Sequence, residues 1–361
     1  MQRRNFLKWG AGAGVMTLTT VAGAANADFG SPTGMADVEE TPAVRFRMGL
    51  CSDLHQDVAP GAAERLQAFV DAMHAENVDV IVQLGDFCCP RESNREIVEI
   101  WNSFRGVRHH VIGNHERDGG FSFEQVLRFF YGDAVPPQPY HSFDSHGYHF
   151  VLLSGNDPLS GVSGYARYIG EEQREWLRGD LCSTKLPILV FCHQGMDISL
   201  CGSGALEDAT AIRYIFEQHN RACPNKVRLV FSGHHHSDFR NVINGIYYIQ
   251  INSMTYSWTN NREYMRHRFS DELEKQYPCL ANCIIYRDPI WATVTIYEDG
   301  SFAMCGRETD FLAPTPQEMG MECGGPTPVT ATISDIPRTP MLPCPAPPNR
   351  VVEKTRNFFH A

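Results

Sequence analysis

The sequence contains no pair of cysteines separated by two residues, although 12 cysteines occur among its 361 residues. Such closely spaced pairs are typical of thiolate zinc sites and of thioredoxin-like redox centres. Their absence argues against both kinds of site. Cys51 and Cys192 lie in apolar runs and are expected to be buried thiols. Loop-pinning disulfides remain open for the later cysteines, which are Cys279, Cys283, Cys305, Cys323 and Cys344.

The sequence also lacks an excess of basic residues. It has 31 lysines and arginines against 42 aspartates and glutamates, which gives a formal net charge of −11 at pH 7. General nucleic-acid binding needs a basic face, so no stable nucleic-acid partner is expected. A metal centre can still bind phosphate within an acidic protein, and a nucleotide substrate is therefore not excluded.

Long runs of large aliphatic residues are missing from the first 27 residues. Arg3 and Arg4 are followed by a stretch rich in Gly, Ala and Thr and then by Ala25-Asn26-Ala27. This order is typical of a twin-arginine signal peptide over residues 1–27, and the stretch is a poor candidate for a membrane span. We therefore expect the twin-arginine translocation machinery as a partner. The mature protein is expected to be periplasmic or otherwise exported, strongly acidic, and without a transmembrane segment.

The rest of the chain is expected to form one large domain, because 43% of the residues are hydrophobic and can supply a full core. We place a linker at residues 28–43, the domain at 44–312 and a proline-rich tail at 313–361. The tail shows no sustained periodicity, so we expect it to pack in an extended form or to be partly disordered. No internal repeat is evident.

Apolar periodicity predicts strands that alternate with helices, as in a parallel α/β sheet. The predicted strands cover residues 44–51, 78–84, 107–112, 148–153, 186–191 and 227–231, and the predicted helices cover 63–76, 93–104, 171–178 and 206–219. Two hairpins are predicted around Asn244-Gly245 and Asp299-Gly300, with strands at 239–243, 246–251, 292–297 and 301–304. The sheet is therefore expected to finish antiparallel.

Five short polar segments follow the predicted strands. They are Asp53-Leu54-His55, Gly85-Asp86, Gly113-Asn114-His115-Glu116, His193 and Gly233-His234-His235-His236. Ligands collect at the carboxyl ends of strands in open α/β sheets, so these donors are expected to converge. Each segment alone is a weak or moderate signal, but together they predict two neighbouring divalent cations near a phosphate. His109, His110 and His235 have no comparable support and are expected in packing or at the surface.

Residues 254–288 form a long polar, aromatic and basic segment between the two hairpins. A loop of this length in a compact domain is usually functional or disordered, and its position after the last polar segment favours a lid over the site. An ordinary loop or a subunit contact is the alternative. Tyr256 and Arg262 in this segment are candidate substrate contacts, and Arg117 beside His115 is a third.

The five segments resemble those of the calcineurin-like metallophosphoesterase superfamily over roughly residues 44–240. The resemblance implies an α/β fold in which a two-sheet mixed β sandwich is flanked by helices, as four layers in the order αββα. Purple acid phosphatases of this superfamily have a Tyr where this chain has Cys89. Together with Asp53-Leu54-His55 in place of their D-x-G, this makes the chain more similar to bacterial phosphatases and class III cyclic-nucleotide phosphodiesterases.

The resemblance further implies that seven of the polar side chains hold two metal ions. Asp86 would bridge the ions, and the other ligands would be Asp53, His55 and His236 for the first ion and Asn114, His193 and His234 for the second. His115 would protonate the leaving oxygen or stabilise the phosphoryl group, with Glu116 orienting it. Catalysis would thus depend on His115, Asp86 and Asn114.

These expectations describe a metal-dependent phosphoric ester hydrolase that acts on a small-molecule phosphomono- or diester. Two cations lower the pKa of a bridging water, so a metal-bridging hydroxide would attack phosphorus directly, without a phosphoenzyme. Mixed His, Asp and Asn ligands suit Mn, Fe or Zn better than Mg or Ca, and the pair stays open. A cyclic-nucleotide phosphodiesterase and a non-catalytic metal-binding adaptor on the same fold are the alternatives.

Overall fold

The computed structural model describes residues 42–224, 226–259, 269–321 and 329–340. The expected signal peptide lies outside these residues, as do Arg262, Cys323 and Cys344. Within the described ranges, no helix combines the length and the apolar character that crossing a membrane requires. Cys279, Cys283 and Cys305 carry free thiols, so no disulfide forms at these three described positions.

The first sheet has six strands in the order β14-β13-β12-β1-β2-β3. Their bounds are β1 (Val44–Cys51), β2 (Val80–Gln83), β3 (Val107–His110), β12 (Ala292–Tyr297), β13 (Phe302–Gly306) and β14 (Ile336–Thr339). Strands β1, β2 and β3 run parallel to one another, whereas β12, β13 and β14 extend the sheet in antiparallel pairs. The antiparallel finish expected from the Asp299-Gly300 hairpin is confirmed.

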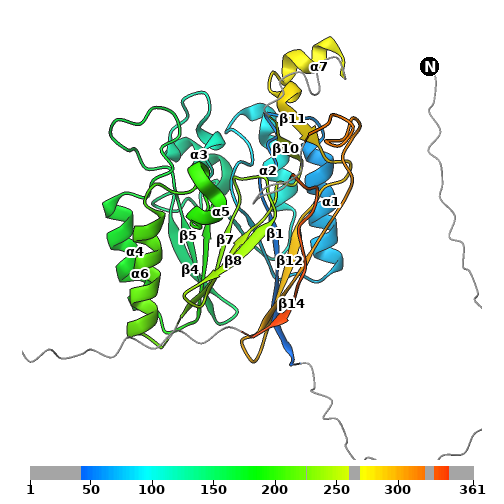
Figure 1. The fold of residues 1–361 in the computed structure, drawn as a ribbon. Helices are drawn as coiled ribbons and strands as arrows, with labels where there is room; N and C mark the ends of the chain where they lie inside the picture. Colours follow the sequence, from blue (N-terminus) through cyan, green and yellow to red (C-terminus); the bar gives the residue numbers. More distant parts are fainter. Residues whose placement is uncertain (1–41, 225, 260–268, 322–328, 341–361) are drawn as a thin grey trace, which may run out of the picture. The chain divides into compact units, whose positions relative to one another are not determined.

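The second sheet also has six strands, in the order β4-β5-β6-β7-β9-β8. Their bounds are β4 (His141–Ser145), β5 (Tyr148–Leu153), β6 (Ile188–Cys192), β7 (Val227–Ser232), β8 (Phe239–Ile243) and β9 (Ile246–Gln250). The central strands β5, β6, β7 and β9 are parallel, and a hairpin closes each edge. Figure 1 shows β7 and β8 of this sheet beside β1 and β12 of the other.

The two sheets pack face to face, with helices on their outer faces (Figure 1). Successive residues of a strand point to opposite faces, so Met48 and Leu50 of β1 enter the core between the sheets while Cys51 enters the cluster beneath the helices. The helices over the first sheet are α1 (Ala62–Ala75), α2 (Arg95–Asn102) and α3 (Phe123–Tyr131), and those over the second are α4 (Glu171–Ser183) and α6 (Ala209–Ala222). The expected four-layer αββα architecture is therefore confirmed.

The described part of segment 254–288 contains regular structure. The strand β10 (Tyr256–Trp258) pairs antiparallel with β11 (Cys283–Ile285), and α7 (Asp271–Gln276) lies between them in sequence. The ladder has a small hydrophobic cluster of its own, which includes Tyr256, Tyr277 and Ile284 together with Ala59.

The remaining elements are short. They are α5 (Ile198–Cys201) and the single 3₁₀ turns Glu92–Asn94, His115–Arg117, Gly202–Gly204 and Leu280–Asn282.

Three further elements, outside segment 254–288, also differ from the sequence expectations. Helix α3 begins at a capping box formed by Ser122 and Gln125, and β4 is a half-buried edge strand; neither was expected. The strand β14 lies beyond residue 312, where the sequence predicts a tail, yet it pairs with β13 and completes the first sheet. Only Ile336 of its four residues is buried, so the pairing with β13, rather than an apolar pattern, determines this strand.

His149 on β5 lies between two carboxylates. Its Nδ1 is 2.6 Å from Asp144 and its Nε2 is 3.0 Å from Asp180 on α4. Burial opposes protonation, but these acids outweigh it and raise the pKa of His149 above 6.5. Protonated His149 therefore stabilises the folded state fully below about pH 6.5, and this contribution is lost as the pH rises through the higher folded-state pKa.

We predict that His149→Gln lowers the free energy of unfolding by roughly 1–3 kcal/mol at about pH 6, because two charge-assisted hydrogen bonds are lost. The difference between variant and wild type should shrink as the pH rises from about 6 to about 9, because folded His149 loses its proton in that direction and unfolded His149 is already neutral. Urea denaturation at the two pH values, under the same metal conditions, measures both quantities. A difference that grows with pH would contradict the role given to His149.

Candidate metal centre

Polar side chains from both sheets meet at the carboxyl ends of the parallel strands. Backbone hydrogen bonds align the segments that carry them: Asp53 N donates to Gly85 O over 3.0 Å, and Gly233 N donates to His193 O over 2.9 Å. The side chains that the structure brings to this edge are, in chain order, Asp53, His55, Asp86, Asn114, His193, His234 and His236. The convergence expected from the sequence is thus present in the structure.

One group of donors consists of Asp53, His55 and His236, whose ligand atoms lie within 4.8 Å of one another. His236 Nε2 is 3.2 Å from Asp53 Oδ1, and His55 Nε2 is 3.6 Å from the same oxygen. His236 Nδ1 donates to the carbonyl of Tyr256 over 2.7 Å, which leaves Nε2 as the nitrogen that faces the group. Three donors therefore point at one small volume.

A second group consists of Asp86, His193 and His234, again within 4.8 Å of one another. His193 Nε2 is 3.1 Å from Asp86 Oδ2, and its Nδ1 donates to the carbonyl of Leu84 over 2.7 Å. Asp86 Oδ2 also lies 3.6 Å from His55 Nε2 of the first group. Asp86 therefore lies between the groups, where a shared ligand would have to be.

Two buried oxygen atoms of the seven side chains accept no hydrogen bond from any described residue. They are Asp53 Oδ1 and Asn114 Oδ1, on side chains that are 0% and 4% exposed. A buried oxygen without a donor costs free energy, and coordination to a cation removes that cost. The donor set of carboxylates, an amide oxygen and imidazoles therefore fits metal ions.

The backbone of the site is unusual in its dihedral angles. Asp53, His55, Asp86, His234 and His236 all have positive φ, between 48° and 75°. Non-glycine residues seldom adopt this left-handed conformation, and it tends to cluster at functional sites. The sharp turns that result direct each side chain back over the strand ends.

Part of the negative charge of the site is compensated within the protein. Burial disfavours the ionised form of Asp86, but His193 outweighs this and lowers the pKa of Asp86 far below its usual value. Burial likewise disfavours protonated His193, and Asp86 reverses this and raises the pKa of His193 to about 10. In the metal-free protein a proton on His193 thus neutralises Asp86. A cation at this position would replace that proton.

His115 lies at the edge of this cluster and is held by Asp118. Its Nδ1 is 2.6 Å from Asp118 Oδ2, and Tyr165 donates to the other oxygen of Asp118 over 2.6 Å. Burial opposes protonation, but Asp86 and Asp118 raise the pKa of His115 to about 9. His115 also lies close enough to Asp86 and His55 for all three to offer ligand atoms within 4.8 Å.

The expectation that Glu116 orients His115 is wrong. Glu116 is fully buried, and its Oε1 accepts a hydrogen bond from Phe87 N over 2.7 Å. The reason is local, because the 3₁₀ turn His115–Arg117 places residues i and i+3 on one side. That geometry brings Asp118 to His115 and turns Glu116 inward.

Two cavities open beside the site. One of about 480 Å³ is lined by Asn114, Arg117 and Tyr165, among others. The other, of about 180 Å³, is lined by His55, Asp86, His115 and Trp258 together with Arg91, Cys89 and further residues. The smaller cavity therefore borders both donor groups, and the larger one extends from Asn114 along the Tyr165 loop.

The three residues expected to contact substrate differ in their placement. Arg117 lines the larger cavity, where its guanidinium lies 4.3 Å from the centre of the Phe123 ring. Tyr256 is fully buried, and its ring packs against His55 and His236, so the expectation that it touches substrate is not supported. Arg262 lies outside the described residues. Among the described residues of this segment, Trp258 is the exposed aromatic residue.

Sequence reasoning did not single out Asp118, Tyr165 or Trp258. Asp118 could have been found, because it lies three residues after His115 and can share one side of a short turn with it. Tyr165 comes from an aperiodic loop far along the chain. Trp258 ends β10, and its ring lies 5.8 Å from that of His236 and 6.5 Å from that of His115.

A four-layer α/β sandwich with carboxylate and imidazole donors at its strand ends defines the chain as a candidate metalloprotein. A model of the calcineurin-like phosphoesterase family matches residues 46–238, which is more than half of the chain. The chain therefore belongs to the calcineurin-like phosphoesterases. Membership of this family supports the view that the protein is a hydrolase of phosphoesters. No curated protein gave a significant match in sequence.

Comparison with solved structures gives matches at low sequence identity. A dimetal phosphatase from Danio rerio is 19% identical, with a TM-score of 0.51 over 73% of this chain and 96% of that one. GAP50, the anchor in the inner membrane complex of Plasmodium, is 15% identical, with a TM-score of 0.48 over 81% and 97%. A putative 5′-nucleotidase from Staphylococcus aureus is 12% identical, with a TM-score of 0.43 over 74% and 53%.

Gly113 provides a test of the packing around Asp86. A Cβ at Gly113 would overlap the backbone nitrogen and the carboxylate of Asp86. We predict that Gly113→Ala displaces this carboxylate, lowers the bound metal measured by elemental analysis, and reduces phosphoester turnover by about 100-fold.

Gly179→Ala is the matched control. Gly179 lies within α4 with open space around its Cα, so alanine there should stabilise the helix by about 0.5–1 kcal/mol and leave the metal content unchanged. Equal metal content and turnover in wild type and Gly113→Ala would show that the close approach at Gly113 does not matter.

Proposed function

We propose that this protein hydrolyses phosphomono- or diesters with two transition-metal ions held at the candidate metal centre. The observation that carries the proposal is the position of Asp86 between two groups of donors, with His115 beside them. The first ion would be held by Asp53, His55 and His236, and the second by Asn114, His193 and His234, with Asp86 shared. Imidazole, carboxylate and amide donors favour Mn, Fe or Zn.

The cations, when bound, would supply Lewis acidity and activate water at neutral pH. The side chains of the chain supply the remaining functions. His115 is positioned to give a proton to the leaving oxygen, because Asp118 accepts from its Nδ1 and leaves Nε2 for the substrate. Tyr165 in turn holds Asp118, so the imidazole is fixed by two successive contacts. Cys89 donates to the carbonyl of His115 over 3.3 Å and supports the same turn.

The walls of the two cavities indicate where the organic part of the substrate would lie. Trp258 is 36% exposed and Tyr165 is 42% exposed, and their ring centres lie 6.5 Å and 5.1 Å from that of His115. Their rings can pack on an apolar or aromatic leaving group, while the guanidinium of Arg117 can pair with an additional phosphate oxygen. A small phosphoester with an aromatic or heterocyclic group therefore fits the site best.

We predict that protein stripped of metal by a chelator does not hydrolyse p-nitrophenyl phosphate or bis-p-nitrophenyl phosphate. Addition of Mn²⁺, Fe²⁺ or Zn²⁺ should restore activity, since the centre supplies the nucleophile. The ratio of kcat/KM for the two esters shows whether a mono- or a diester is preferred. Metal-loaded protein that turns over neither ester, nor a wider panel including cyclic nucleotides, would contradict the proposal and favour a non-catalytic adaptor.

The proton donor is tested separately from metal binding. We predict that His115→Ala lowers kcat by roughly 10²–10⁴-fold on an alkyl phosphate, and by less on p-nitrophenyl phosphate, whose leaving group needs little protonation. Asp118→Asn should lower kcat less than His115→Ala does, and again more on the alkyl phosphate than on p-nitrophenyl phosphate. The asparagine side chain has nearly the same shape as aspartate but holds His115 less firmly. Both variants should retain the wild-type metal content in elemental analysis. Equal losses on both esters would contradict proton donation by His115.

A further inference from the structure

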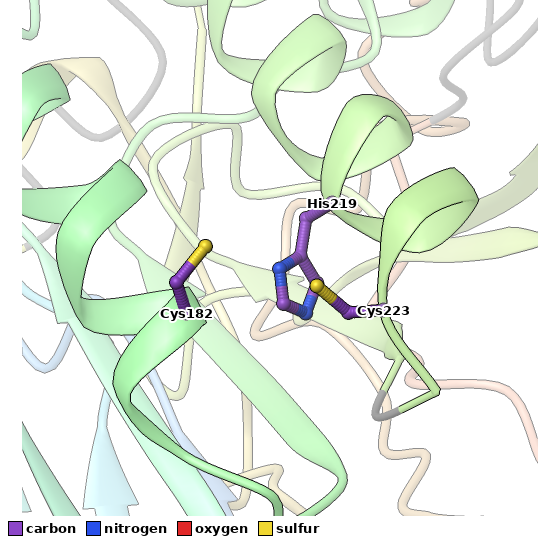
Figure 2. Close-up of side chains that lie close together, drawn as sticks. All are labelled: Cys182, His219 and Cys223. Atoms are coloured by element: carbon purple, nitrogen blue, oxygen red, sulfur yellow. The ribbon is translucent and has the colours of Figure 1, made fainter.

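A second group of potential metal ligands lies away from the candidate metal centre. Cys182 is on the last turn of α4, and His219 and Cys223 are at the end of α6 (Figure 2). These helix ends precede β6 and β7, whereas the candidate metal centre follows the same two strands. The two groups are therefore at opposite ends of the second sheet.

The backbone directs these three side chains toward one another. Cys223 caps the C-terminus of α6, and its backbone nitrogen donates to the carbonyl of His219 over 2.9 Å, so the two residues lie on one face of the helix end. Helices α4 and α6 lie side by side over the second sheet, and their contact brings Cys182 to that face (Figures 1 and 2). The ligand atoms of Cys182, His219 and Cys223 lie within 4.8 Å of one another.

The separation of these ligand atoms is close to what tetrahedral coordination of an ion needs. Zinc bonds of about 2.3 Å to sulfur and about 2.0–2.1 Å to nitrogen put neighbouring ligand atoms roughly 3.4–3.8 Å apart. Cys182 is exposed, so packing restricts the rotation of its side chain less than that of a buried residue. His219 is 6% exposed, so its ring is already held in place by packing.

The two thiols also interact unfavourably when both are ionised. Desolvation, and after it the nearby Cys223, raises the pKa of the Cys182 thiol. A divalent cation removes that conflict, because it attracts both thiolates and binding releases their two protons to solvent. Two sulfurs and one imidazole nitrogen are soft and borderline donors, which select Zn²⁺ over Mg²⁺ or Ca²⁺.

We propose that Cys182, His219 and Cys223 bind one Zn²⁺ ion, with a fourth position open to water on the exposed side of Cys182. The ion would join the C-terminal ends of α4 and α6. Bonds form from the metal to two thiolate sulfurs and one imidazole nitrogen, two protons leave, and no electron is transferred. This site is independent of the proposed hydrolysis. It also differs from the sequence expectation, because the ligands come from two helices rather than from one closely spaced cysteine pair.

Cobalt substitution tests the site in the full-length protein, purified under reducing conditions. Thiolate ligands give Co²⁺ an intense charge-transfer band that nitrogen and oxygen ligands alone do not give. We expect this band in wild type and in Cys305→Ser, a control at an exposed thiol on β13, and its loss in Cys182→Ser and Cys223→Ser. Elemental analysis after zinc loading should find one equivalent of zinc less in Cys182→Ser and Cys223→Ser than in wild type.

Stability and thiol protection provide readouts that do not depend on activity. Zinc should raise the Tm of wild type and Cys305→Ser by more than that of Cys182→Ser, and it should slow alkylation of Cys182 at least tenfold. Equal zinc content in wild type and Cys182→Ser, or alkylation that zinc does not slow, would overturn the proposal. Formation of a Cys182–Cys223 disulfide in the presence of zinc would also overturn it, since the pair would then be a covalent cross-link.

Discussion

The electrostatic repulsion between two buried acids, Asp53 and Asp86, is the constraint on which this site depends. Both carboxylates are within 3.6 Å of His55 Nε2, and neither side chain reaches solvent to any extent. Buried like charges cost free energy unless positive charge or hydrogen bonds compensate for them. The backbone amides of His234 and His115 supply part of that compensation. The surrounding imidazoles supply more, and cations at the centre would complete it.

The fold could be predicted from sequence because its strands carry strong signals. Runs such as Val80–Gln83 and Ile188–Cys192 are wholly buried, so they appear as continuous apolar segments. The polar residues that follow them could be predicted for the same reason, since parallel strands bring their carboxyl ends to one edge. Elements without such a signal, above all β14, depend on a pairing partner far away in the chain.

The finer details of the site depend on turns and packing that periodicity does not report. A single 3₁₀ turn decides that Asp118 rather than Glu116 contacts His115. The small hydrophobic cluster beneath β10 decides that Tyr256 is buried, while Trp258 at the end of the strand stays accessible. Both differences concern a few residues, and both change which side chains can reach a substrate.

The donors of the candidate metal centre come from both sheets of the sandwich. Asp53 and Asp86 follow strands of one sheet, and His193 and His236 follow strands of the other. Hydrogen bonds already cross this boundary, for example from His193 to the carbonyl of Leu84. Coordinated ions would add bonds across this boundary. The supply of metal would then determine the stability of the contact between the two sheets as well as the activity. A cell short of metal would then lose the protein to proteolysis as well as lose its chemistry.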